Sequence, residues 1–110
     1  MNHREASLNK EIKKVTSRLL AGIDFPKAQL VTITRAEISS DLKDVNIFVS
    51  VFPFEKSKET LEKIRNKKNS LKKKAAQRIE IKNFPEFHFK KEEKNEAADR
   101  INRVLNKIDS

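Results

Sequence analysis

Two runs of alternating apolar and polar residues, separated by a short polar segment, constrain the fold of this chain more than any other feature. The run from Leu30 to Ile38, LVTITRAEI, is rich in β-branched residues and places Val31 and Ile33 on one face. From Val45 to Phe52, valine or isoleucine occupies alternate positions. The residues Ser39-Ser40-Asp41 between the runs favour a tight turn. The sequence therefore predicts two neighbouring strands that run antiparallel to each other.

Helical periodicity surrounds this pair of strands. Near the N-terminus, apolar residues recur three or four positions apart as far as about Ala21, and Asn2 and Glu5 have the spacing of a capping box. Gly22 is the only glycine of the chain, and it stands where a helix end commonly takes a residue with positive φ. We expect the first helix to end there.

Two further helices are predicted after the second strand. Ser57 is placed to cap the first of them, and Asn69-Ser70 falls between the two periodic segments. Asparagine tolerates left-handed backbone geometry and serine caps a new helix. Two helices that meet at a bend are therefore favoured over one straight helix.

The rest of the chain predicts a third strand and a last helix. In Ile81–Phe89, IKNFPEFHF, Phe87 and Phe89 share a face, and Pro85 restricts the segment to a sheet edge or marks the strand's entry. The stretch from about Glu93 to Asp109 has a helical stripe formed by Ala97, Ala98, Ile101, Val104, Leu105 and Ile108. The order helix, strand, strand, helix, helix, strand, helix indicates an α+β domain, with helices packed on a three-stranded sheet.

A length of 110 residues fits one domain, residues 1–110, because a second unit of about 50 residues would bury too little apolar surface to stand alone. The apolar runs are far shorter than the roughly 18 residues of a membrane span, and no signal-peptide apolar region is seen. The absence of cysteine agrees with a reducing compartment. We expect a cytoplasmic monomer that does not contact membranes.

The positive charge is concentrated between Lys56 and Lys82. The chain has 25 lysines and arginines against 16 acidic residues, a net charge of +9, and this segment holds eleven of the basic residues and only three of the acidic ones. A one-sided positive field favours a polyanionic partner such as nucleic acid. The candidate RNA-binding residues are Arg65, Lys67, Lys68, Asn69, Lys72, Lys73, Lys74 and Arg78, together with Lys27 and Lys43 outside the segment.

A lysine run can also be no more than the solvated face of a helix, which is the simpler interpretation of any single lysine. The concentration of so many cations favours phosphate binding. If five to eight of them displace counterions, log K falls with log salt at a slope of roughly −3.5 to −7. Lysine contacts phosphate as a point charge and reads no bases, so affinity is predicted and sequence preference is not.

All seven aromatic residues are phenylalanines, the largest apolar side chains of a protein without tryptophan or tyrosine. We expect Phe48, Phe87 and Phe89 to be buried. Phe25 and Phe54 stand beside prolines in predicted loops and are better candidates for exposure and base stacking.

Catalysis is poorly supported. His3 lies near the N-terminus and His88 alternates with two phenylalanines, so they do not form an evident metal pair. Asp41 and Asp44 fit an Asx turn better than a pair of catalytic or metal-binding carboxylates. A chain with one glycine has no glycine-rich phosphate loop. We expect no enzyme, no cofactor and no small-molecule substrate.

The stretch from Val31 to Val51, VTITRAEISSDLKDVNIFVSV, resembles the ribosome-binding factor A family. It combines a Val-Thr-hydrophobic strand, a glutamate before a Ser-x-Asp-Leu turn, and a second strand of the family's type. Phe25-Pro26-Lys27 is similar to the family's Asp-Pro-Arg after the first helix, and Phe84–Phe89 is similar to its Val-Pro-Glu-Leu-x-Phe strand. The resemblance extends from about Leu8 to Ile108, although Phe25 replaces the family's aspartate.

This resemblance implies a KH-like fold of the second topological type, α-β-β-α-α-β, with an additional C-terminal helix and without a GxxG loop. The family's Ala-x-Gly kink falls at Lys67-Lys68-Asn69, where asparagine would take the left-handed position of glycine. The implied function is binding to the immature small ribosomal subunit and its 16S rRNA, which aids late maturation and 5′-end processing, especially in the cold.

Two other functions remain open from the sequence. One is a general KH-like RNA-binding module that acts on messenger or other RNA. The other is a protein-interaction domain in which the strand Leu30–Ile38 or Ile81–Phe89 pairs with a partner's strand. Binding by such a domain should survive neutralisation of the lysines, whereas RNA binding should not.

Overall fold

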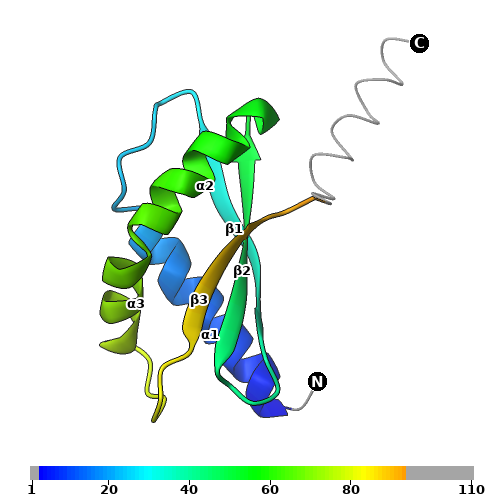
Figure 1. Ribbon diagram of the computed structural model, residues 1–110, viewed down its shortest axis with the longest axis vertical. Coiled ribbons are helices and arrows are strands. Elements are labelled where there is room, and N and C mark those ends of the chain that lie inside the picture. Colours follow the sequence, from blue (N-terminus) through cyan, green and yellow to red (C-terminus); the bar gives the residue numbers. More distant parts are fainter. Residues whose placement is uncertain (1–2, 94–110) are drawn as a thin grey trace, which may run out of the picture.

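The computed structural model describes residues 3–93, whose helices pack against one three-stranded sheet (Figure 1). The elements are, in chain order, α1 (His3–Leu20), β1 (Leu30–Ile38), β2 (Asp44–Phe52), the 3-10 helix η1 (Phe54–Lys56), α2 (Ser57–Asn66), α3 (Lys68–Ala76) and β3 (Glu86–Lys91). This order confirms the predicted α+β class and the KH-like succession of elements. The last predicted helix, over about 93–109, lies outside the described residues except for Glu93, and so does Asn2.

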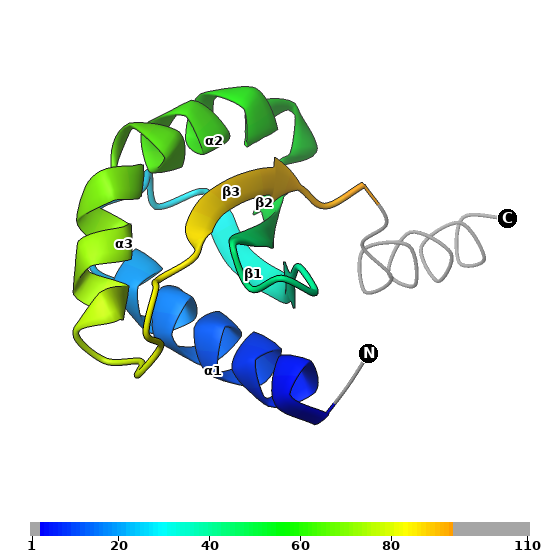
Figure 2. The same cartoon turned by 60° about the horizontal axis from the view of Figure 1, so that its bottom comes forward.

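The sheet has the order β1-β2-β3, so β2 is its central strand. As predicted, β1 and β2 are antiparallel, with Leu30 opposite Phe52 and Val31 opposite Val51. β3 pairs with β2 in the parallel direction, which requires a long crossover between them, and α2 and α3 form that crossover. In Figure 2, the three helices form an arc around one side of the sheet and leave its other face open.

The core lies between this sheet and the helices. Val45, Ile47 and Val49 of β2 are completely buried, as are Ile12 of α1 and Ile64 of α2. On β3, the predicted pair Phe87 and Phe89 is buried and the two rings meet edge to face. The alternation read in the sequence thus gives the inward face of β2 and β3 directly.

A β-bulge changes the inward face of β1. The register shifts between Ile33 and Arg35, so that Ile33 is buried before the bulge and Ala36 and Ile38 are buried after it. The prediction that Phe48 is buried in the core is wrong. Its ring lies on the open face of the sheet, half-buried, with the guanidinium of Arg35 3.8 Å from the ring centroid.

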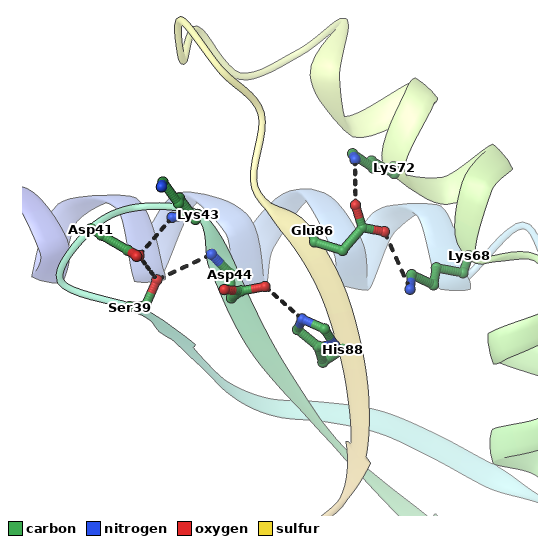
Figure 3. A network of polar contacts seen from close by, with 8 residues as sticks. All are labelled: Ser39, Asp41, Lys43, Asp44, Lys68, Lys72, Glu86 and His88. Atoms are coloured by element: carbon green, nitrogen blue, oxygen red, sulfur yellow. Dashed lines mark hydrogen bonds and ion pairs between the residues drawn. The ribbon is translucent and has the colours of Figure 1, made fainter.

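The β1–β2 connection is held by its own polar side chains (Figure 3). Asp41 Oδ1 accepts hydrogen bonds from the hydroxyl of Ser39 at 2.6 Å and from the amide of Lys43 at 3.0 Å, which is the predicted Asx turn. The Ser39 hydroxyl, and then the Lys43 amide, hold the pKa of Asp41 below its ordinary value. Leu42 completes the turn in the left-handed region, at φ 61°.

Two predicted helix boundaries are corrected in detail. Gly22 does not take a positive φ, because successive backbone hydrogen bonds from Ala21, Gly22 and Ile23 to Ser17, Leu19 and Leu20 close the end of α1. Ser57 is the first residue of α2 and not its cap, since its hydroxyl donates to the carbonyl of Phe54 in the preceding 3-10 turn. Within residues 3–93, no helix is both long and apolar enough to cross a membrane.

Candidate nucleic-acid interface

The basic segment folds into α2 and α3, which are joined at a single residue. α2 buries Leu61 and Ile64, and α3 buries Leu71 and Ala75. Lys67 separates the two helices at φ −101° and ψ 8°, donates its amide to Ile64 at 2.9 Å and accepts the amide of Leu71 at 2.9 Å. The predicted bend is therefore present, and the amide and the carbonyl of Lys67 both remain hydrogen-bonded at it.

The predicted position of the bend at Asn69-Ser70 is wrong. Asn69 lies inside α3, and Leu42 is the only residue other than glycine with positive φ in the described chain. The conformation of Lys67 is in the bridge region, which any L-residue can adopt. A one-residue break of this kind needs neither glycine nor asparagine, which is why two lysines are accommodated at the kink.

Two of the candidate lysines share one ion-pair partner within the protein. Lys68 and Lys72 stand one turn apart on α3, and both reach Glu86 at the start of β3, with N–O distances of 3.2 and 2.8 Å (Figure 3). Lys72, and then Lys68, hold the pKa of Glu86 below its ordinary value. These two cations are consequently part of the contact between α3 and β3, and their charge is partly balanced.

Arg65 is also held by the fold. Its Nε and Nη2 both donate to the main-chain carbonyl of Phe89, at 3.1 and 2.7 Å. The acceptor is a neutral carbonyl, so the positive charge remains, but the guanidinium is fixed against β3. Loss of the Arg65 side chain would therefore remove a contact between α2 and β3.

Apart from Arg65, four candidate cations of the basic segment are exposed and form no ion pair within the described chain. They surround the outer side of α3 and its two ends, and they are Lys67, Lys73, Lys74 and Arg78. Asn69 is exposed on the same helix. We call these four cations the α3 cation cluster. Because Leu71 and Ala75 fix the inward side of α3, Lys73 points away from the sheet and Lys74 lies on the flank of the helix opposite Lys72.

Lys27 and Lys43 lie outside the α3 cation cluster, at opposite ends of β1. Lys27 precedes β1 and Lys43 follows it, so the nine-residue strand separates them by about 27 Å. The loop that holds Lys27 packs beside α2, where Thr60 donates to Gln29. Lys43 lies near the start of β3, where its carbonyl accepts the amide of Glu86 at 2.9 Å. Both side chains are exposed.

Polar contacts on the open face of the sheet were not predicted from the sequence. His88 Nε2 lies 2.8 Å from Asp44 Oδ1, across the β2–β3 pair (Figure 3). Arg35 contacts Glu37 on its own strand and Glu92 after β3. The His88–Asp44 and Arg35–Glu92 contacts depend on the parallel register of β3, for which the sequence offered no signal. In residues 3–93, no group of three or more histidine, aspartate or glutamate side chains is arranged to hold a metal ion.

Comparison with known proteins identifies one family. A family model described as ribosome-binding factor A matches residues 4–105. The ribosome-binding factor A of Brevibacillus brevis is 33% identical over 107 residues, which cover 96% of this chain and 88% of that protein. The crystal structure of ribosome-binding factor A from Thermus thermophilus superposes with a TM-score of 0.71 at 20% identity, over 79% of this chain and 94% of that one.

A second similar structure comes from a complex. A homology model of the Thermus thermophilus ribosome-binding factor A, fitted into a cryo-EM map of a 30S–RbfA complex, has a TM-score of 0.64. It is 21% identical to this chain and covers 83% of it, with 93% of its own length matched. At this identity, the likeness establishes the shared fold.

Proposed function

The chain belongs to the ribosome-binding factor A family, and we propose that it is a ribosome assembly factor that binds the precursor of the small ribosomal subunit. The proposed partner is the 16S rRNA of that precursor, and the proposed outcome is late maturation with processing of the rRNA 5′ end. The protein acts by binding, in the cytoplasm, as a monomeric single domain without a cofactor and without catalysis of its own.

The observation that carries this proposal is the α3 cation cluster in a chain of this family. Lys67, Lys73, Lys74 and Arg78 are exposed, and Glu86, the carboxylate that forms ion pairs with α3 in the described chain, is already paired with Lys68 and Lys72. The four remaining cations are therefore free to replace counterions along an rRNA backbone. A family relative is named as part of a 30S complex, which gives that backbone its proposed identity.

Strand pairing with a protein partner is a weaker explanation, because both sheet edges are partly occupied. On β3, the carbonyl of Phe89 accepts two hydrogen bonds from Arg65. On β1, the amide of Ile38 donates to Asn9 of α1 at 2.8 Å, and the bulge after Ile33 interrupts the edge. Side-chain capping and bulges of this kind are the means by which proteins protect sheet edges from further pairing.

Co-sedimentation with precursor small subunits tests the proposal. We expect replacement of the α3 cation cluster by glutamine, as Lys67→Gln, Lys73→Gln, Lys74→Gln and Arg78→Gln together, to remove the protein from the particle fraction. Lys68, Lys72 and Arg65 are left unchanged, because their contacts with Glu86 and Phe89 support the fold.

The matched control removes the same number of cations from α1. Lys10, Lys13, Lys14 and Arg18 are all exposed there. Their replacement by glutamine gives the same net charge and should leave most of the binding intact. If both variants lost the same amount of particle binding, the interaction would depend on net charge alone and not on the α3 cation cluster. Equal affinity of the wild type for precursor particles and for bulk RNA at matched salt would favour a general RNA-binding module.

A further inference from the structure

The largest exposed apolar side chains of the described chain gather at one end of the sheet. Leu30, Phe52 and Phe54 are 67%, 64% and 57% exposed. Leu30 and Phe52 are directly opposite each other across the β1–β2 pair, so they share a face. Phe54 follows two residues later in η1, where Lys91 Nζ lies 4.2 Å from the centroid of its ring. We call these three residues the apolar end patch. Large exposed apolar side chains that gather at one end of a sheet often mark a surface that is covered in the working protein.

The direction of β3 brings the end of the described chain to this patch. β3 runs parallel to β2, with Lys91 opposite Val49, and the amide of Glu92 donates to the carbonyl of Val49 at 2.9 Å. Phe52 lies three residues further along β2, which is about 10 Å. A chain that continued in the direction of β3 would therefore run toward the end of β2 that carries the apolar end patch.

The segment that follows β3 is held on the open face of the sheet by Glu92. Both of its carboxylate oxygens face Arg35, at 3.3 Å from Nε and from Nη2, and its side chain is only 9% exposed. Arg35 itself lies over the ring of Phe48, which belongs to the open face. Phe48 and Phe52 are on the same side of β2, because they are separated by an even number of residues. The chain is thus fastened to the face that Leu30 and Phe52 occupy.

The sequence beyond Glu93 has the composition that such a patch requires. Residues 94–110 have apolar side chains at helical spacing and polar ones elsewhere, and as a helix they would span about 25 Å, enough to cross the patch. The apolar positions are Ala97, Ala98, Ile101, Val104, Leu105 and Ile108. We propose that residues 94–110 dock in the same molecule on the apolar end patch, with this stripe against Leu30, Phe52 and Phe54.

Paramagnetic relaxation in the full chain tests this docking. The protein has no cysteine, so Asn106→Cys provides one attachment point for a nitroxide, on the side of the segment opposite its apolar stripe. We expect the amides of Leu30, Phe52 and Phe54 to lose at least half of their intensity. The amide of Ser40, at the other end of β1, should keep its intensity. Unchanged intensity at the patch would overturn the proposal.

Two variants separate docking from nonspecific proximity. Leu105→Asp in the labelled chain alters the proposed stripe and no described residue, and Phe52→Asp alters the patch at a position that is already exposed. Each should restore the lost intensity, and persistent broadening in both would contradict the proposed contact.

A mixing experiment identifies the occupant. One chain carries the nitroxide but no ¹⁵N, and the other is enriched in ¹⁵N but carries no nitroxide. When the two are mixed, intramolecular docking predicts no broadening of the ¹⁵N-enriched chain's signals. Broadening in the mixture would instead indicate a second copy on the patch. If the amide signals of the patch change only after RNA is added, RNA and not residues 94–110 covers this surface. That result would also overturn the proposal.

Discussion

At the scale of single residues, Glu86 decides which lysines remain available to an anion. Lys72 and Lys73 are neighbours in the sequence, but Lys72 lies beside the buried stripe of Leu71 and Ala75 and meets Glu86 at 2.8 Å. Lys73 is turned away by one helical step of about 100° and meets no carboxylate in the described chain. A difference of one position thus separates a cation that is held within the fold from one that is exposed and proposed to bind phosphate.

The Glu86 ion pairs predict a specific dependence of stability on pH. Because Lys72 and Lys68 lower the pKa of Glu86 in the folded protein, its ionised form stabilises the fold above the ordinary glutamate pKa. This contribution is lost as the pH falls through the lowered value. The difference in unfolding free energy between wild type and Glu86→Gln, measured by urea denaturation, should be present at pH 7 and shrink at about pH 3. A difference that grows towards acid pH would contradict this assignment.

Gly22 provides a second test at this scale. Its φ is not positive, and a β-carbon added there would meet the carbonyl oxygen of Leu19 at 3.4 Å, at the edge of ordinary contact. Gly22→Ala should therefore stabilise the protein by about 0.4–1 kcal/mol, chiefly because alanine restricts the unfolded chain. Urea denaturation measures this difference. Destabilisation instead would mean that the end of α1 needs glycine after all.

At the scale of elements, periodicity predicts a helix or strand well where one face is buried. β1 has the predicted bounds of Leu30 and Ile38, because β-branched alternation and a capped turn determine both of its ends. β3 begins at Glu86 and not at Ile81, because its pairing starts where β2 starts, at Asp44. That parallel register joins segments about forty residues apart. No local pattern encodes it, and the contacts of Glu86 and His88 were missed for the same reason.

The bend between α2 and α3 gives a prediction for an element. Asn69 is an exposed interior residue of α3, so Asn69→Ala should stabilise the protein by about 0.5 kcal/mol through helix propensity. If Asn69 had the left-handed conformation expected from its place at the kink, the same change would cost about 1 kcal/mol or more. Ser70→Ala, at the next exposed position of α3, is the control for propensity alone. Thermal or urea unfolding of the two variants distinguishes these alternatives.

At the scale of the whole molecule, the fold concentrates exposed positive charge on α3 without placing every candidate cation on one surface. The α3 cation cluster lies on the crossover that joins β2 to β3, on the helix side of the sheet (Figure 2). Lys27 and Lys43 lie at opposite ends of β1, separated by more than a Debye length of about 8–10 Å. A long ligand such as rRNA can contact several of these places at once, whereas a small anion cannot.

The dependence of binding on salt measures how many of these charges engage phosphate. Replacement of the four clustered cations by glutamine should reduce the magnitude of the slope of log K against log salt by roughly 3, since each phosphate contact contributes about 0.7–0.9. The α1 control variant, with the same net charge, should keep nearly the wild-type slope. Affinities for precursor small subunits, measured at several salt concentrations for the three proteins, provide the comparison. Three equal slopes would mean that the described cluster contacts no phosphate, and that the particle is bound through another surface of the protein.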